Sequence, residues 1–314
     1  MAAIGKIIAI LGAGWAGCHA GLFLKKKGHD ITIFEKESKI FTGSSGNNQF
    51  RHHKGYHYPR SFQTIEMIKN NSCRFEQDYG FCLQRIPENY YAISKNSSLI
   101  DNGIYEKIFP ELVPTKETIF NFKNLSRIYK ANESLIATSC VVDFFTSHLK
   151  DNILYETLPS QQYENYDLVI DCTNNNKNTL DLVKKEYKLY ILEATQSLKD
   201  LFSITIMDGD FCSIYPHETQ GKYTLSHVKY SDLTLDLSEK ERIDLILESI
   251  GYFFDEFKTN FKVVDSFIGI KNFNKHVKDT SRLLEHSFCN NVLSFSMTKI
   301  LSIYEIEDLL EGIL

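Results

Sequence analysis

Hydrophobic positions near the start of the chain follow two kinds of pattern. The apolar, β-branched run at 6–11 has the length of a buried strand, and residues 30–34 form a second run of that kind. Between them, residues 18–28 have helical composition and end on a glycine. This order of strand, helix and strand predicts the first unit of an α/β domain with a parallel sheet.

Strand-forming segments dominate the middle of the chain. Residues 89–94, 202–207, 223–230 and 263–270 alternate or run in β-favouring side chains, and Asp-Gly-Asp at 208–210 is a hairpin signal. We expect a mainly antiparallel sheet from these segments.

Two helices are predicted by apolar stripes. The first begins at a capping box from Ser238 to Glu241, and its buried face identifies it as scaffold. The second follows a short strand inside residues 291–310, near the carboxyl end. Its stripe consists of Ile300, Ile303, Tyr304, Leu309, Leu310 and Ile313.

Composition narrows the class of partner. The chain has 314 residues, 43% of them hydrophobic, and a formal net charge of −5, which argues against a nucleic acid and favours a small molecule. Seven scattered cysteines form no Cys-x-x-Cys pair, so we expect reduced thiols in a cytoplasmic protein and neither a disulfide framework nor a metal site.

One segment could be mistaken for a membrane anchor. Residues 7–24 contain no Asp, Glu, Lys or Arg. Glycines at 12, 14 and 17 interrupt this run where a strand would turn into a helix, so we expect neither a membrane span nor a targeting segment.

The same glycines belong to a longer motif, GxGxxGxxxGxxLxxxGxxIxxxE, over residues 12–35. Gly12 permits the tight turn, Gly14 lets backbone amides approach a pyrophosphate, and Gly17 allows close packing of helix on strand. The helix amino terminus adds positive charge, and Glu35 would accept hydrogen bonds from a ribose, which favours FAD or NAD over NADP. The cofactor residues assigned to this unit are Gly12, Gly14, Trp15, Ala16, Gly17, Glu35 and Lys36.

Three further segments carry a family resemblance. The polar loop 41–50 resembles the loop that lines the FAD pyrophosphate in glutathione reductase-like flavoproteins, particularly the D-amino acid oxidase (DAO) branch. Residues 166–176 are similar to that family's strand followed by Ala-Thr-Gly, with Asn174 in the glycine place, and 291–310 resembles the segment presenting a helix amino terminus to the flavin. The resemblance implies FAD contacts from Ser44, Ser45, Asn47, Asn48, Cys172, Thr173, Met297, Thr298, Lys299 and Ile300.

The resemblance also implies an interleaved architecture. A Rossmann-like FAD-binding domain, a parallel sheet with helices, would comprise residues 1–50, 131–190 and 285–314. A substrate-binding domain on the mainly antiparallel sheet would comprise 51–130 and 191–284.

The stretch RHHKGYHYPR at 51–60 would then lie where flavin meets substrate. Metal binding by His53 and His57 would need a helix that Gly55 and Pro59 disfavour. Two readings stay open: the residues pack an ordinary turn, or they act on substrate and flavin. Under the second reading the catalytic residues are His57, Tyr58 and Arg60, and the substrate-binding residues are Arg51, His53, Tyr215 and Arg282.

The predicted function is that of an FAD-dependent oxidoreductase, which oxidises an amine, amino acid or sugar derivative by hydride transfer to flavin N5. One alternative is a redox-neutral flavoenzyme acting on a nucleotide sugar, because UDP-galactopyranose mutase carries a similar glycine-and-histidine turn. The other alternative is a dinucleotide-binding module that performs no chemistry.

Overall fold

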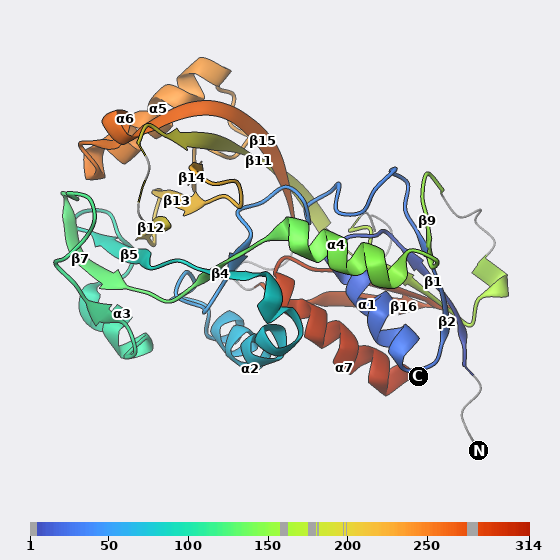
Figure 1. Ribbon diagram of the computed structural model, residues 1–314. Coiled ribbons are helices and arrows are strands. Elements are labelled where there is room, and N and C mark those ends of the chain that lie inside the picture. The colour runs from blue at the N-terminus through green and yellow to red at the C-terminus, as the bar shows by residue number, and fades with distance from the viewer. Residues whose placement is uncertain are drawn as a thin grey trace.

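The computed structural model describes residues 5–157, 163–174, 180, 182–196, 198, 200–274 and 282–314. Two large sheets organise these residues (Figure 1). A six-stranded sheet carries helices α1 (Trp15–Lys26), α4 (Thr138–Leu149) and α7 (Ile303–Ile313), and an eight-stranded sheet lies at the other end of the molecule.

Strand β1 lies at the centre of the six-stranded sheet, and its residues Ile8, Ala9 and Ile10 are completely buried. Burial on both sides explains why this strand is an unbroken apolar run. All neighbouring pairs are parallel except the edge pair β16–β17. In spatial order the strands are β16 (Glu285–Cys289), β17 (Val292–Ser296), β10 (Leu168–Asp171), β1 (Ile7–Leu11), β2 (Asp30–Phe34) and β9 (Ile153–Leu154).

The eight-stranded sheet is antiparallel apart from one parallel pair, β5–β12. Its longest strands, β11 and β15, pair along their whole length. In spatial order the strands are β15 (Phe261–Asn274), β11 (Leu182–Ala194), β14 (Lys222–His227), β13 (Cys212–Pro216), β12 (Phe202–Met207), β5 (Glu88–Ser94), β7 (Leu125–Lys130) and β6 (Val113–Pro114).

A small sheet connects the two large ones. Its middle strand β8 (Ser134–Ile136) pairs with β3 (Arg51–His52) and with β4 (Leu83–Arg85), which fixes the start of the 51–60 stretch. The remaining helices are α2 (Phe62–Tyr79), α3 (Asn102–Ile108), α5 (Glu239–Phe253) and α6 (Phe257–Asn260), with short 3-10 turns at Gly80–Cys82, Tyr163–Asn165 and Ile300–Ser302.

The predicted fold class, a Rossmann-like parallel sheet beside a mainly antiparallel one, is confirmed. Two boundaries differ from the sequence prediction. The first helix begins at Trp15, three residues earlier than expected, and the strand expected at 223–230 ends at His227. It ends there because Nδ1 of His227 accepts hydrogen bonds from the backbone N–H groups of Lys229 and Tyr230, which closes a turn.

The division into two domains stays a prediction. The boundary expected at residue 190 falls inside β11, which pairs within the eight-stranded sheet along its whole length. Among the described helices, none combines the length and the apolarity needed to cross a membrane.

Candidate cofactor and substrate site

The glycine-rich turn after β1 depends on two of its glycines. Gly12 has a φ of +90°, a conformation that side chains disfavour. A Cβ atom on Gly17 would lie 1.9 Å from the carbonyl oxygen of Gly12, so only glycine lets helix α1 begin this close to the strand. The predicted reasons for both glycines therefore hold in the structure.

The amino end of α1 and the 41–50 loop meet at Ser45. Its Oγ accepts a hydrogen bond of 2.9 Å from the backbone N–H of Trp15, and a Cβ atom on Gly14 would approach the same Oγ to 2.8 Å. Ala16 lies buried in this first turn, and the Trp15 ring packs among aromatic side chains. The first turn of the helix thus presents backbone and no long side chain at this point, and its Trp15 amide donates to Ser45.

The carboxylate of Glu35 borders this turn at the end of β2. Its Oε2 accepts a hydrogen bond of 2.8 Å from the backbone N–H of Ala13, and its Oε1 accepts one of 3.0 Å from Glu37. The side chain is buried, which fixes its orientation beside the amides. This geometry fits a dinucleotide whose phosphates meet the helix terminus and whose ribose meets Glu35.

The other polar side chains of the loop brace its backbone. Asn47 Nδ2 donates to the carbonyl oxygens of Thr42 and Gly43, and Asn48 Nδ2 donates to that of Ser44. Ser44 Oγ donates to Ile270 on β15. These side chains stabilise the conformation of the 41–50 loop. Lys36 instead forms an exposed ion pair with Glu37.

Two distant segments assigned to the cofactor lie together. Asn174 donates from Nδ2 to the carbonyl oxygen of Met297 (3.4 Å), and the backbone N–H of Met297 donates to Oδ1 of Asn174 (3.3 Å). Asn174 has a φ of +57°, so it takes the left-handed conformation expected of it. Cys172 and Thr173 pack against Gly12. Asn175 and Asn176, the last residues of the 166–176 motif, lie outside the described part of the chain.

The segment after β17 reaches the 51–60 stretch. Lys299 Nζ lies 4.5 Å from the centre of the Tyr58 ring, and Thr298 Oγ1 donates to the carbonyl oxygen of Arg282. Burial and the nearby Arg51 lower the pKa of Lys299 to about 7. Ile300 opens the 3-10 turn that leads into α7. The predicted flavin and substrate residues therefore adjoin one another.

Arg51 lies at the centre of a buried polar cluster. Its guanidinium stacks on Tyr215, 4.1 Å from the ring centre, while Tyr215 OH donates to the carbonyl oxygen of Ser134. Nη1 donates to Thr205 Oγ1 at 2.6 Å and to Tyr91 OH at 3.2 Å. These contacts fix the arginine rigidly in the core.

Glu133 supplies the opposite charge. Its Oε2 lies 4.0 Å from Nη1 of Arg51 and accepts a hydrogen bond of 2.8 Å from Tyr91 OH. Its Oε1 accepts one of 3.0 Å from the backbone N–H of Lys54 and lies 3.5 Å from His53 Nδ1. Because the carboxylate is buried, these partners determine where the 51–60 stretch lies.

The two predicted histidines lie beside each other and beside Tyr58. The ring centres of His53 and His57 are 6.0 Å apart, and that of His57 is 5.1 Å from Tyr58. Burial, reinforced by Arg51 and Lys299, lowers the pKa of both imidazoles well below the usual value. Their Nδ1 atoms are inaccessible to solvent and have no hydrogen-bond partner within the described residues. Both rings are therefore neutral; Nδ1 of His53 faces the Glu133 carboxylate, whereas Nδ1 of His57 has no polar partner among the described residues.

Arg60 lies apart from this cluster. Its Nε and Nη2 donate to the two carboxylate oxygens of Asp208 at 2.7 and 3.0 Å, and nearly half of its side chain is exposed. This geometry favours a structural role for Arg60 over the predicted catalytic one. Arg282 joins the region through its backbone N–H, which donates to Thr64 Oγ1.

Sequence reasoning missed three residues of the cluster, namely Glu133, Tyr91 and Thr205. Glu133 is an isolated acidic residue between β7 and β8, so no motif points to it. Tyr91 and Thr205 lie inside strands whose pattern predicts only a sheet. The one signal for Tyr91 and Thr205 is that each is a polar side chain within an otherwise apolar strand.

Comparisons with known proteins match the first part of the chain to a family model and 72% of the chain to curated relatives. The family model of an NAD(P)-binding Rossmann-like domain matches residues 10–76. The FAD-dependent monooxygenase FPY4 of Fusarium mangiferae is 30% identical over 243 residues, 72% of this chain and 65% of that protein. The FAD-dependent monooxygenase kojA of Aspergillus flavus is 26% identical over 271 residues, 72% of this chain. The aligned regions span 65% and 63% of the lengths of these relatives.

Solved structures extend the likeness to the fold. Glycine oxidase from Geobacillus kaustophilus superposes with a TM-score of 0.72 at 13% identity, over 98% of this chain and 95% of that one. L-Amino acid deaminase from Proteus vulgaris gives a TM-score of 0.68 at 12% identity, over 98% and 94%. The predicted resemblance is confirmed for the fold, which the chain shares with glycine oxidase and L-amino acid deaminase over 98% of its length.

Proposed function

We propose that the chain is an FAD-dependent oxidoreductase that oxidises a small polar substrate, an amine or amino acid being favoured, by hydride transfer. One observation carries this proposal. We call the glycine-rich turn, the start of α1 and the 41–50 loop the dinucleotide cradle. The contact between Lys299 and Tyr58 joins this cradle to the buried polar cluster of Arg51, Glu133, His53 and His57. Cofactor and substrate chemistry would meet at this contact.

FAD fits the cradle better than NADP. A pyrophosphate would replace Ser45 Oγ as the acceptor of the Trp15 amide at the start of α1, and a 2′-phosphate would meet the buried carboxylate of Glu35. Bound FAD would supply a hydride acceptor at N5. The polar loop around Ser44 and Ser45 offers a second wall for the pyrophosphate.

The neighbouring side chains would orient the substrate and handle its proton. A neutral imidazole of His53 or His57 can accept a hydrogen bond from the ammonium or hydroxyl group of the substrate and so orient it. The amine of Lys299, whose pKa is lowered to about 7, is better matched to take up the proton that this group must lose before hydride leaves its carbon. Arg51 keeps its charge, because Glu133 lies beside it and the fixed hydrogen bonds hold the guanidinium. The rings of Tyr58 and Tyr215 would help to exclude water.

The test is anaerobic mixing of FAD-loaded protein with amino acids, primary and secondary amines, and sugar derivatives. We expect one class to bleach the flavin absorbance at a rate that saturates with concentration. Chemical reduction of the flavin by dithionite serves as the control for an accessible cofactor. If dithionite bleaches the flavin and no amine, amino acid or sugar derivative does, the proposal fails.

A second candidate is a monooxygenase, because both curated relatives carry that name. With NADPH as an external donor of two electrons, one atom of O2 would enter the substrate and the other would leave as water, and the same residues would shield the reduced cofactor from solvent. Turnover under ¹⁸O₂ separates the candidates: label in the product supports the monooxygenase, and unlabelled product with hydrogen peroxide supports the oxidase. The relatives and neighbours named above lend no support to the nucleotide-sugar alternative.

A further inference from the structure

The chain that leads from the dinucleotide cradle to Arg51 runs across the eight-stranded sheet. Ser44 Oγ donates to a backbone carbonyl oxygen of β15, and Gln49 Nε2 donates to Thr224 Oγ1 on β14. Arg51 Nη1 then donates to Thr205 Oγ1 on β12. One side of this sheet therefore adjoins both the cradle and the polar cluster.

Lys271 of β15 lies on that side of the sheet. A Cβ atom on Gly269 would come within 3.0 Å of the backbone carbonyl oxygen of Asn47, so this position of β15 is directed at the cradle. Side chains two residues apart on a strand point to the same side, and Lys271 is two residues further on. Its Nζ lies 4.6 Å from the ring centre of Tyr187, the residue opposite Gly269 on β11. Lys271 and Tyr187 thus share the cradle side of the sheet.

The amine of Lys271 is accessible, yet it lies in a recess. The side chain is exposed, but the surrounding protein, together with Arg282 and Arg51, lowers its pKa from 10.5 to about 8. Within the described residues no carboxylate lies at ion-pair distance from Lys271, whereas Lys185, opposite it on β11, pairs with Asp232 at 3.4 Å. An anion can therefore reach this amine and neutralise its charge.

Two other cations nearby are less suited to hold an anionic substrate. Arg51 is engaged with the protein, because its Nη1 donates to Tyr91 and Thr205 and its charge is balanced by Glu133. Lys299, with a pKa of about 7, suits the uptake of a proton better than a lasting charge. The amine on β15, with its pKa of about 8, stays mostly protonated at neutral pH.

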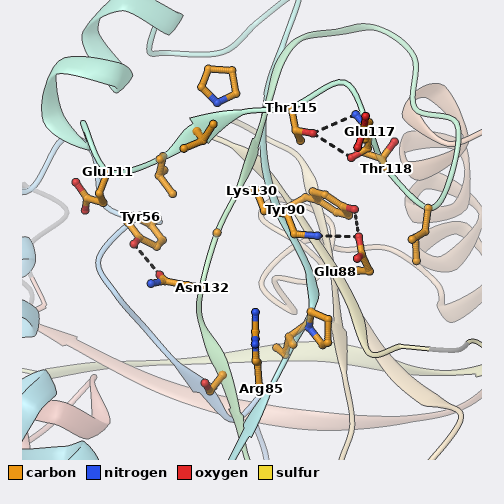
Figure 2. Close-up of a pocket in the computed structure, with 18 residues that line it drawn as sticks. Tyr56, Arg85, Glu88, Tyr90, Glu111, Thr115, Glu117, Thr118, Lys130 and Asn132 are labelled. Carbon is orange, nitrogen blue, oxygen red and sulfur yellow. Dashed lines mark hydrogen bonds and ion pairs between the residues drawn. The ribbon is translucent and has the colours of Figure 1, made fainter.

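The hollow of about 1050 Å³ beside the 130–134 segment is unsuited to an anion. Its lining carries more carboxylates than cations, and the charged residues are Arg85, Lys130, Glu88, Glu111 and Glu117. Lys130 Nζ donates to Glu88 at 2.9 Å, so this amine is already paired (Figure 2). A carboxylate would meet net negative charge there, which it does not meet at Lys271.

We propose that Lys271 binds the carboxylate of the substrate and thereby selects an amino acid over a simple amine or a neutral sugar derivative. This inference rests on the proposed function, because it takes the space between the cradle and the polar cluster as the place of the substrate. A carboxylate gains a charged hydrogen bond from the ammonium group that a neutral group of the same shape cannot match.

Calorimetric titration of the FAD-loaded protein tests this assignment. The probes are propionate and its neutral amide, propionamide, neither of which carries an amine to be oxidised. We expect one propionate to bind per chain, more tightly than propionamide. Lys271→Met should weaken the binding of propionate by about tenfold, the usual effect of losing one charged hydrogen bond, and Lys271→Arg, which keeps the charge, should retain it.

The matched control is Lys262→Met, at an exposed lysine near the other end of β15, which should bind propionate like the wild type. The flavin absorbance of each variant checks that the cofactor content is equal. The proposal is overturned if propionate binds no more tightly than propionamide, or if Lys271→Met binds propionate as the control does. Calorimetry needs no turnover: binding of propionate that depends on Lys271, in a protein whose flavin no amino acid bleaches, would refute the oxidation and leave this site standing.

Discussion

Arg51 and Glu133 lie side by side in the core, with Nη1 of the arginine 4.0 Å from Oε2 of the glutamate and both side chains almost inaccessible to solvent. Glu133→Gln would leave the guanidinium charged and uncompensated. We expect the free energy of unfolding to fall by about 3 kcal/mol, the lower end of the range for breaking a buried pair. Denaturant titration followed by circular dichroism measures this loss.

Glu311→Gln is the control for that variant. Glu311 pairs with Lys27 at the surface, where both side chains are about half exposed, so its loss should cost below about 1 kcal/mol. An equal fall in the free energy of unfolding for the two variants would show that the buried pair stabilises the fold no more than the exposed pair.

Gly14→Val should prevent retention of the cofactor. The valine side chain would enter the space in front of Ser45, where Cβ alone comes within 2.8 Å of Oγ, and would block the amides of the helix terminus. Purified variant should therefore release no FAD on denaturation. Gly251→Ala, at a glycine of α5 with an ordinary φ and no atom within 4 Å of its Cβ position, serves as a control for the cost of changing a glycine. A Gly14→Val protein with a full complement of FAD would contradict the placement of the pyrophosphate.

His57→Ala should leave FAD binding intact and slow flavin reduction by substrate by about tenfold, the usual effect of losing one hydrogen bond to a charged group. The reason is that a neutral imidazole with an unused nitrogen lies beside Tyr58 and Lys299. Stopped-flow absorbance under anaerobic conditions gives the rate. Arg60→Gln, which breaks only the exposed pair with Asp208, should reduce at the wild-type rate. Equal rates for His57→Ala and wild type would make His57 a packing residue.

Lys299 should titrate near neutral pH in the cofactor-free protein, because burial and Arg51 lower its pKa to about 7 from 10.5. Between these two values the unfolded chain binds more protons than the folded chain, so the free energy of unfolding falls as pH is lowered through this window. Acetic anhydride labelling, read by mass spectrometry, follows the free amine. Its rate at Lys299 should reach a plateau above about pH 7. A rate that still rises toward pH 10.5 would contradict the shift.

The glycine-rich turn after β1 could be predicted from sequence because its geometry depends on residues close together in the chain. Gly12, Gly17 and Glu35 sit at fixed spacings along one strand, helix and strand, and each spacing follows from how these elements connect. Even Asn174 could be anticipated, since the left-handed conformation is a property of single residues.

The polar cluster could be predicted only in part, because it depends on contacts between distant segments. Arg51 meets Thr205 and Tyr215 from β12 and β13, and Glu133 comes from the connection between β7 and β8. No residue near Arg60 in the sequence indicates that its guanidinium will form an ion pair with Asp208. Which side chains from distant segments come into contact depends on the order of the strands in the sheet and on their register.

The most direct measurement is the visible spectrum of the purified native protein, followed by chromatography of the molecule released on denaturation. We expect flavin absorbance bands and release of FAD, because the turn at Trp15 and the carboxylate of Glu35 suit a dinucleotide. A colourless protein that stays colourless after incubation with FAD, or one that releases NAD, would contradict the proposed flavoenzyme and leave only its fold standing.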